Sequence, residues 1–423
     1  MPKKYTLLFI FASIIFLGHF LFSGQAIYGD GIDYWAYLPS IYFDHDIDFQ
    51  NEYRHVYNPE NNNSYNPEKA PEIQKTRYTS IGKTDNPHPP GTAIVWFPAF
   101  VSADAISAIF NFPRTGYANT YQIIVGLWSI LLTTFALYLN EQIVYKLIKD
   151  RKIALIATLG IFFATPLLYY GSYDILNSHF VSFFFSSLTL YLILVKPIDL
   201  KSALLIGISI GLATLVRIQE TLLLIPTFIY FYLHKDLRVK LPVIFFIWLI
   251  LTLPLGFLWL YLYGYPLPET YTAFGKNEWL KFGSLFHFTN GLFFRTPIIL
   301  LSLFGLKQLI QKEKLVLWVF ATFFILQYIL ITFQGGWEAA AYGGRMYIST
   351  LPLFTILLAF ALKLIKQKWS MKLATSIVIL FSIVNMLSIA SFVLFEKEVN
   401  SGRKRGLEEQ TQEKVLKIIN NFF

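Results

Sequence analysis

The 423-residue sequence contains no cysteine, and only 14% of its residues are charged. The absence of cysteine excludes disulfide bonds, iron–sulfur clusters and thiolate chemistry. A soluble domain of this length would carry roughly a quarter charged residues. Long apolar runs take the place of the missing charge, and many are close to the roughly 20 residues that a membrane-crossing helix needs. The composition therefore indicates an all-α polytopic membrane protein.

The charged residues that are present carry a net charge of +9. A charge of this sign can indicate a nucleic-acid partner, but here the cations lie in short loops between apolar runs. That pattern is a signal for membrane topology, so we expect the lipid bilayer and no nucleic acid as a partner. The basic clusters are Lys146/Lys149/Arg151/Lys152, Lys196/Lys201, Lys235/Arg238/Lys240, Lys307/Lys312/Lys314 and Lys363/Lys366/Lys368/Lys372.

The apolar segment 91–110 decides the topology. If it crossed the membrane, the N-terminal lysines and the later basic clusters would lie on opposite sides. It contains Pro98 and Asp104, as an interfacial helix can, and without it all of the clusters become cytoplasmic. The sequence then predicts about eleven spans, with the N-terminus inside and the C-terminus outside. The expected spans are 5–23, 118–139, 153–170, 178–195, 202–216, 221–233, 241–263, 291–306, 315–333, 346–362 and 373–395.

This topology predicts two parts. Residues 1–395 form the transmembrane domain, and within it residues 24–117 form one large external loop. Residues 396–423 form a short external tail that reads as an amphipathic helix. The first apolar run is followed by no small-x-small cleavage pattern, so we expect a retained helix and not a signal peptide.

The external loop contains the stretch GDGIDYWAYLPSIYFDHDIDFQNEY (29–53), which has six carboxylates and no lysine or arginine. Asp30 and Asp33 are three residues apart and share one face of a helix that starts near Gly31. Asp30 suits an N-cap, but it also suits a general base at a membrane surface. We predict a catalytic role for Asp30, with Asp33 in catalysis or metal binding.

Three further acids, Asp44, Asp46 and Asp48, alternate along the chain as in a calcium loop. Counted from Asp44, the sixth residue is Phe49 where an EF-hand has glycine, and the twelfth is His55 where it has glutamate. The EF-hand pattern therefore fails, and a divalent metal remains one interpretation beside a solvated loop.

Two histidines lie at predicted external positions. His88 opens a rigid His-Pro-Pro-Gly turn, and His179 follows Asn177 and Ser178 at the start of a predicted span. Contact with a substrate is one interpretation of both, and a satisfied interfacial histidine is the other. Ser178 is the expected cap of the helix that follows.

Arg217, Arg295 and Arg345 fall at external ends of predicted spans, where cations are scarce. They are either interface anchors or ligands of a lipid phosphate, which arginine binds bidentately. Near the last of them, the segment GGWEAAAYGGR combines flexible glycines with residues suited to substrate contact. The candidates in this segment are Trp337, Glu338 and Tyr342.

External acids, a few external arginines and a lipid-facing scaffold together suggest sugar transfer from a lipid phosphate. The phosphate leaving group needs charge stabilisation, and the attacking hydroxyl needs one base. A transporter or lipid flippase is the first alternative, although the polar residues collect at the ends of the spans and not at mid-membrane. An O-antigen-type polymerase is the second, although its large loop usually comes late in the chain.

The sequence resembles the GT-C superfamily of integral-membrane glycosyltransferases, in particular bacterial members that modify envelope glycans. The similar stretches cover about residues 25–355: the 29–53 segment, HPPGTAIVWFPAF, NSHF, LVRIQETLLLIP, NGLFFRTPIILL and GGWEAAAYGGRMYISTLPLF. Many members carry two adjacent acids after the first helix, whereas here Gly31 follows Asp30 and the second acid is Asp33.

The resemblance implies a GT-C-like fold with juxtamembrane helices in the first external loop and Asp30 as the catalytic base. It also implies a polyprenyl-phosphate-sugar donor, a glycan, lipid or protein acceptor, and inversion at the sugar carbon. It implies a multi-pass protein of the bacterial cytoplasmic membrane with a periplasmic active site. The superfamily has members with and without metal, so no cofactor is certain and a divalent metal stays open.

Overall fold

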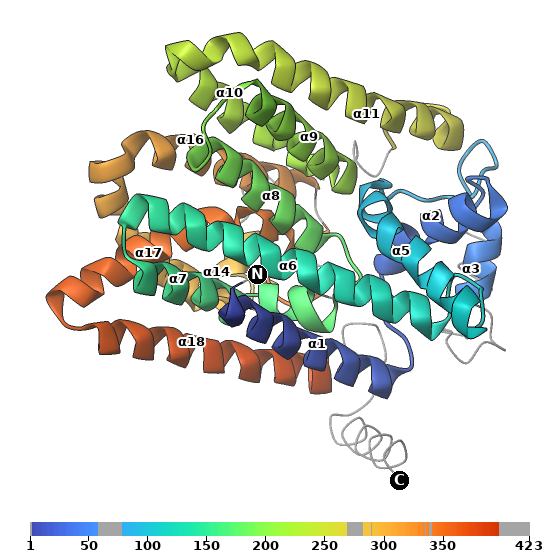
Figure 1. The fold of residues 1–423 in the computed structure, drawn as a ribbon, viewed down its shortest axis with the longest axis horizontal. Helices are drawn as coiled ribbons and strands as arrows, with labels where there is room; N and C mark the ends of the chain where they lie inside the picture. The colour runs from blue at the N-terminus through green and yellow to red at the C-terminus, as the bar shows by residue number, and fades with distance from the viewer. Residues whose placement is uncertain are drawn as a thin grey trace.

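The computed structural model describes residues 2–57, 78–268, 282–288, 290–334, 336–337 and 341–396. These residues form a bundle of long helices with a group of shorter helices at one end (Figure 1). No strand forms within these ranges, where Tyr78 and Thr84 make one isolated antiparallel bridge. The expected all-α architecture is therefore confirmed.

The first half of the chain supplies the short helices and the first part of the bundle. Its elements are α1 (Lys3–Ser23), α2 (Gly31–Pro39), η1 (Ser40–Asp44), α3 (Gln50–Tyr57), α5 (Gly91–Phe110), α6 (Asn119–Ile148), α7 (Arg151–Phe163), η2 (Tyr169–Tyr173), α8 (His179–Leu194) and α9 (Leu200–Val216).

The second half completes the bundle. Its elements are η3 (Ile218–Leu223), α10 (Leu224–Leu233), η4 (Lys235–Lys240), α11 (Leu241–Tyr263), α13 (Gly283–Phe286), α14 (Leu292–Arg295), α15 (Pro297–Ser302), η5 (Leu303–Gly305), α16 (Leu306–Gln334), η6 (Arg345–Thr350), α17 (Leu351–Lys368), α18 (Met371–Ser391) and η7 (Phe392–Glu396). α16 is broken at Glu313, whose φ of −139° and ψ of 49° are not helical.

Helix ends follow ordinary capping chemistry. The Asp150 carboxylate accepts hydrogen bonds from the first amides of α7, and Asp199 and Ser370 do the same for α9 and α18. α1 and α11 end at Gly24 and Gly264, which have positive φ angles of 73° and 82°. Glycine adopts that backbone conformation without strain, so these helices stop where the sequence provides it.

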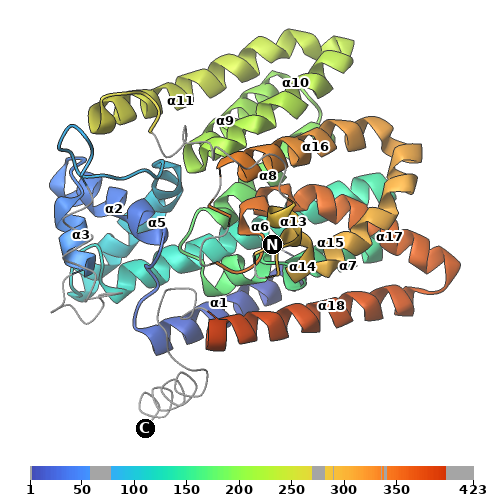
Figure 2. The ribbon, with the colours of Figure 1, turned by 180° about the vertical axis from the view of Figure 1, so that it is seen from behind.

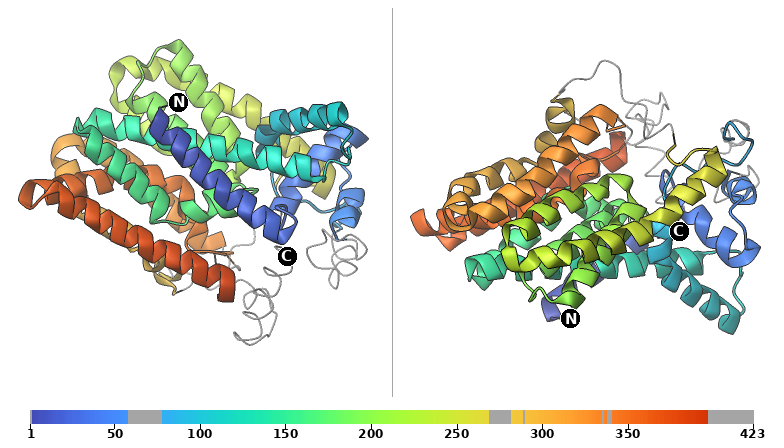
Figure 3. Two further views of the ribbon diagram at one scale, coloured as in Figure 1. Left: turned by 60° about the horizontal axis from the view of Figure 1, so that its bottom comes forward. Right: turned by 90° about the horizontal axis from the view of Figure 1, so that it is seen from above.

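Close packing inside the bundle depends on small residues. α9 and α11 run side by side (Figure 3), and Gly207 and Gly211 of α9 lie against α11. A Cβ on Gly207 would lie 2.9 Å from the Cβ of Ile247, and one on Gly211 would lie 2.8 Å from a methyl carbon of Leu251. Small residues four apart let two helices approach closely where lipid offers no hydrophobic driving force.

The basic clusters meet at one end of the bundle, which we call the basic end. Lys4 pairs with Glu141, so the start of α1 lies beside the end of α6. Lys366 Nζ lies 2.7 Å from Asp150 Oδ2, which adds the end of α17 and the start of α7. The grouping of the N-terminal lysines with the later clusters is as the topology argument requires.

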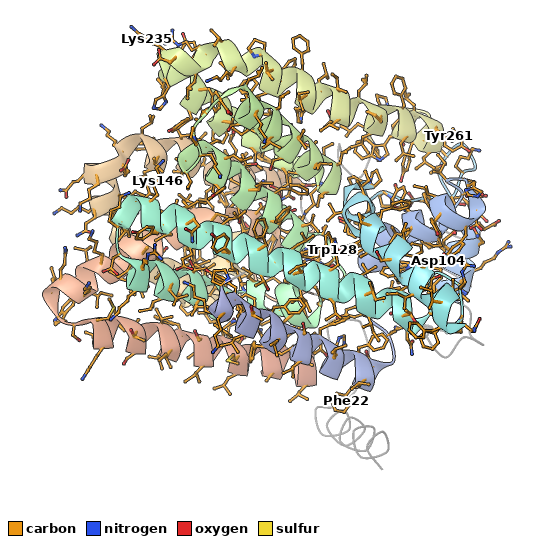
Figure 4. All side chains as sticks on the ribbon, viewed as in Figure 1. Phe22, Asp104, Trp128, Lys146, Lys235 and Tyr261 are labelled. Carbon is orange, nitrogen blue, oxygen red and sulfur yellow. The ribbon has the colours of Figure 1, made fainter. Side chains whose placement is uncertain are left out.

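The short helices α2, α3 and α5 lie at the opposite end, which we call the site end (Figure 2). Figure 4 shows this polarity in single side chains, with Lys146 and Lys235 at the basic end and Asp104 and Tyr261 at the site end. The separation of the chain into a basic end and a site end therefore exists in three dimensions.

α5 lies against the outer part of α6. Trp96 Nε1 donates to Ser129 Oγ at 2.9 Å, and Trp128 Nε1 donates to the carbonyl oxygen of Val95 at 3.0 Å. α6 has 30 residues, and at about 1.5 Å per residue it is about 45 Å long, roughly 15 Å more than the hydrocarbon core of a bilayer. α5 therefore covers the portion of α6 nearest the site end, as an interfacial helix would.

By length and composition alone, six helices of the described chain are able to cross a membrane, or seven if the bent pair Pro297–Val319 and Ala321–Gln334 is one span. α5 is one of the six, and three further apolar helices are shorter. A polytopic membrane protein is confirmed, while the count of eleven spans and the interfacial position of α5 stay predictions.

The absence of cysteine makes α5 directly testable. In single-cysteine variants Ile81→Cys and Phe112→Cys, a membrane-impermeant maleimide should label both positions from the same side of intact cells or spheroplasts. Lys235→Cys should react only after permeabilisation, because the basic end is expected in the cytoplasm. Labelling of positions 81 and 112 from opposite sides would show that α5 crosses.

Candidate functional site

Two glycines allow the site-end helices to touch the ends of the bundle. A Cβ on Gly31 would overlap the carbonyl oxygen of Leu176, in the loop between η2 and α8. A Cβ on Gly91 would overlap the backbone of Leu215 and Val216 at the end of α9. The start of α2 is thus held against the loop before α8 and the start of α5 against the end of α9, and the acidic stretch is fixed at that junction.

Asp30 occupies the N-cap position of α2, but its carboxylate does not cap the helix. It accepts a hydrogen bond from Arg345 Nη1, with 3.2 Å between Nη1 and Oδ2. The Asp30 side chain is 45% exposed, and that of Arg345 is 18% exposed. The capping interpretation is therefore wrong for this side chain, which combines an ion pair with an accessible carboxylate.

Asp33 lies one turn further along α2 and is buried. Its Oδ2 lies 3.5 Å from Nε2 of His88, and its backbone oxygen accepts from Asn86 Nδ2 at 3.0 Å. The Tyr37 hydroxyl donates to the carbonyl oxygen of His88 at 2.9 Å. α2 therefore holds the segment before the His-Pro-Pro-Gly turn, and Asp33 is placed to orient His88.

Arg217 and His179 form the second half of the site. Arg217 Nη1 lies 2.5 Å from His179 Nδ1, and Nη2 lies 2.8 Å from the sulfur of Met346. Since Met346 follows Arg345 in the chain, the two arginines approach the same place from α9 and from η6. The structure thus brings Arg217, His179 and Arg345 together beside Asp30.

Asn177 determines where α8 begins. Its Oδ1 accepts from the backbone amide of His179 at 2.7 Å, whereas Ser178 makes no side-chain capping bond. The expectation that Ser178 caps this helix is therefore wrong, because the amide oxygen one residue earlier reaches the helix amide first.

Tyr34 and Tyr170 are site residues that the sequence analysis missed. The Tyr34 ring lies 4.7 Å from that of His88, and the Tyr170 ring lies 4.9 Å from that of His179. Burial raises the pKa of Tyr34 to about 12 and Asp30 adds to the rise, while Arg217 acts against it. The phenol is neutral at physiological pH and available as a hydrogen-bond donor. Its position four residues after Asp30 was the available signal.

Two buried side-chain amides, those of Gln219 and Gln327, hold the Arg217 guanidinium in position. Gln219 Oε1 accepts from Arg217 Nη2 at 3.1 Å, and Gln219 Nε2 donates to Gln327 Oε1 at 2.9 Å. Gln327 also donates to a carboxylate oxygen of Glu220 at 3.3 Å. Buried polar groups satisfied in this way fix the geometry of the charged group they contact.

A cavity of about 430 Å³ adjoins these amides. Gln219 lines it at one side, and apolar and aromatic residues of η3, α11 and α16 line most of the rest, among them Leu222, Trp248, Trp259 and Leu330. Such a lining suits an apolar chain whose polar head lies near Arg217.

The candidates from the later part of the chain lie in different places. Tyr342 adjoins the site, because its backbone amide donates to the Tyr170 hydroxyl at 3.0 Å. Arg295 points toward α18, where Nη1 donates to Ser388 Oγ at 2.8 Å. The Trp337 ring is buried beside His287 at 5.7 Å. Glu338 lies outside the described residues.

The acids Asp44, Asp46 and Asp48 do not converge. Asp44 accepts from Asn51 Nδ2 at 2.7 Å, and Asp48 accepts from Thr84 Oγ1 at 2.6 Å. Asp46 accepts from the Ser40 hydroxyl at 3.0 Å. In the described parts of the chain, no three histidine or acidic side chains are grouped to hold a metal ion. The three carboxylates shape the loop there, and metal binding stays a prediction.

Comparisons with known proteins give one structural likeness. No family model matches the sequence, and no curated protein matches it. The fold is similar to that of the archaeal oligosaccharyltransferase AglB from Archaeoglobus fulgidus, solved in complex with an inhibitory peptide and a dolichol-phosphate. The TM-score is 0.52 at 13% identity, over 97% of this chain and 56% of that one.

This likeness extends to the fold alone, and the chain spans about half of the neighbour's length. Together with the helical architecture it confirms the predicted GT-C-like fold class. The roles of the site residues rest on the geometry described above.

The contact at Gly31 yields a test of how the site is assembled. Gly31→Ala should lower the free energy of unfolding by about 1–3 kcal/mol, because the new methyl group overlaps backbone that cannot move easily. Gly18→Ala is the matched control, since no atom lies within 4 Å of its added Cβ. Thermal unfolding in detergent should show a loss for the first variant only, and equal stability would contradict the close approach.

Proposed function

We propose that this protein is a membrane glycosyltransferase that moves a sugar from a polyprenyl-phosphate-linked donor to an envelope acceptor. The observation that carries the proposal is the accessible carboxylate of Asp30 opposite Arg345, with Arg217 and His179 adjacent. An exposed base and two partly buried guanidinium groups match the two needs of this reaction, a proton acceptor and a stabilised phosphate leaving group.

In the proposed reaction, an acceptor hydroxyl attacks the anomeric carbon of the donor sugar. Asp30 accepts the hydroxyl proton as the new carbon–oxygen bond forms. The bond between the anomeric carbon and the phosphate oxygen breaks, and Arg217 and Arg345 hold the negative charge of the departing lipid phosphate. Attack from the face opposite the phosphate inverts the configuration, as in the inverting members of the superfamily that the sequence resembles.

The remaining site residues orient these groups. His88 and Tyr34 border the position of the acceptor, and His179 fixes the direction of the Arg217 guanidinium. Asp33 acts through His88. A binding site held by packed helices in this way loses little entropy when the substrates bind, which favours a reactive orientation.

The cavity beside Gln219 supports a lipid-linked donor, since its apolar walls suit the first units of a polyprenyl chain. The structural neighbour was solved with a dolichol-phosphate, a molecule of the same chemical class. The basic end suits the cytoplasmic side and the site end the external side. We therefore propose the cytoplasmic membrane of a bacterium, with the active site on the periplasmic face.

The central test is Asp30→Asn, which keeps the size of the side chain and removes its basicity. Sugar transfer by purified protein should fall by about 10²–10⁴-fold, while the melting temperature and the affinity for the lipid donor stay close to those of the unchanged protein. Asp236→Asn, an exposed acid in η4 at the basic end, is the control and should retain activity. Near-normal turnover of Asp30→Asn would remove this residue from the mechanism.

The arginines give a second, independent test. Arg217→Gln and Arg345→Gln should each weaken binding of a polyprenyl phosphate by about tenfold or more, because each removes a charge-assisted hydrogen bond. Arg295→Gln should have the smaller effect, because its guanidinium already contacts Ser388. Binding is measured directly with the purified variants in nanodiscs. A larger loss for Arg295→Gln would show that the phosphate binds at Arg295 and not at Arg217 and Arg345.

A further inference from the structure

A polar cavity lies at the far end of α2, separate from the Asp30 site and from the apolar cavity beside Gln219. It has a volume of about 380 Å³, and Pro39, the last residue of α2, lines it. Pro39 follows Asp30 by nine residues, which on a helix corresponds to roughly 13 Å. Trp35 Nε1 donates to the carbonyl oxygen of Gly116 at 3.0 Å, so α2 is fixed to the loop that forms the opposite wall.

Two buried side chains in the wall of this cavity each carry one atom without a hydrogen-bond partner, although the Glu52 carboxyl also hydrogen-bonds Asp44. The Glu52 residue is 2% exposed, and its Oε2 has no hydrogen-bond partner. The hydroxyl of Tyr117, also a wall residue, is buried without a partner. An unsatisfied buried polar atom costs about 1–3 kcal/mol, and a ligand with hydroxyl groups in this cavity would supply both missing bonds.

The charges around these groups favour a neutral ligand. Burial, and then the nearby Asp44 carboxylate, raises the pKa of Glu52 to about 8, so this carboxyl is mainly protonated at neutral pH. Arg114 at the rim is already paired with Asp104, with 2.7 Å between Nη2 and Oδ2. A phosphate would meet the Asp44 carboxylate, and in the described residues no three acids or histidines are grouped to hold a metal.

The shape and chemistry of the lining suit a sugar. The His55 ring lies 4.4 Å from the Tyr117 ring at an angle of 30°, so the two rings stack on each other, and both line the cavity. Both also line a neighbouring cavity of about 540 Å³, together with Thr115, so the two hollows share these walls. Aromatic faces next to a few hydroxyl, amide and carboxyl groups are typical of sites that bind a molecule with apolar faces and many hydroxyls.

We propose that this cavity is a second carbohydrate-binding site, in which Glu52 and Tyr117 hydrogen-bond the hydroxyls of a neutral sugar. Within the proposed transferase, that sugar belongs to the acceptor glycan, whose reacting end lies at Asp30. The assignment of this sugar to the acceptor rests on the proposed function, whereas the binding of a sugar in this cavity does not. The enzyme would then select acceptors long enough to bridge both ends of α2.

The test uses the purified full-length protein in nanodiscs and saturation-transfer NMR. The probes are neutral trisaccharides of glucose, mannose, galactose and N-acetylglucosamine. At least one should bind, and Glu52→Ala should weaken it by about tenfold. Tyr117→Phe, which removes one hydroxyl, should weaken it by roughly 3–10-fold. Glu52→Gln keeps both a donor and an acceptor and should bind within about twofold of the unchanged protein.

Asp236→Asn, at the exposed basic end, is the control and should bind the trisaccharide normally. Three results would each overturn the second site. The first is no binding of any probe at about 10 mM. The second is binding by Glu52→Ala and Tyr117→Phe as tight as that of the unchanged protein, and the third is binding lost in Asp30→Asn but kept in Glu52→Ala. Normal sugar transfer by Asp30→Asn together with sugar binding that depends on Glu52 would refute the proposed mechanism and leave this site standing.

Discussion

The contact between Asp30 and Arg345 joins parts of the chain that are 315 residues apart. It depends on two close backbone approaches, at Gly31 and at Gly91, which hold α2 against the loop before α8 and α5 against the end of α9. Without them the acidic stretch would be a solvated loop, and the arginines at the helix ends would be interface anchors. The same junction also places His179 and Arg217 beside the carboxylate, so the whole candidate site depends on it.

Much of the architecture follows from the sequence because a membrane leaves few choices. Backbone polar groups in lipid must bond within their own segment, so apolar runs become helices. Basic loops report which ends lie together, and the pairing of Lys4 with Glu141 agrees with that expectation. Asp30 was predicted from the acidic stretch, and Arg217, Arg345 and His179 from their positions at external ends of predicted spans, where cations are scarce. The structure brings these four together.

The remaining features depend on contacts between distant segments, which a single sequence does not reveal. Tyr170 and Gln327 look like ordinary members of apolar runs until the fold places them beside His179 and Gln219. Arg295 has the same sequence signature as Arg345, yet the kinked chain turns it toward α18. Glu52 is one acid among six in its stretch, and its buried carboxyl oxygen without a hydrogen-bond partner distinguishes it.

The length of α6 has a consequence for where the chemistry takes place. This helix is about 15 Å longer than the hydrocarbon core of a bilayer is thick; α5 packs against its half nearest the site end, and α2 is hydrogen-bonded to Gly116 just before it. Under the proposed topology, with this excess length on the external side, the site residues would lie at the depth of the lipid headgroups. The donor of the proposed transferase would then reach them by lateral diffusion with its tail still in the bilayer, while a water-borne acceptor would arrive from above.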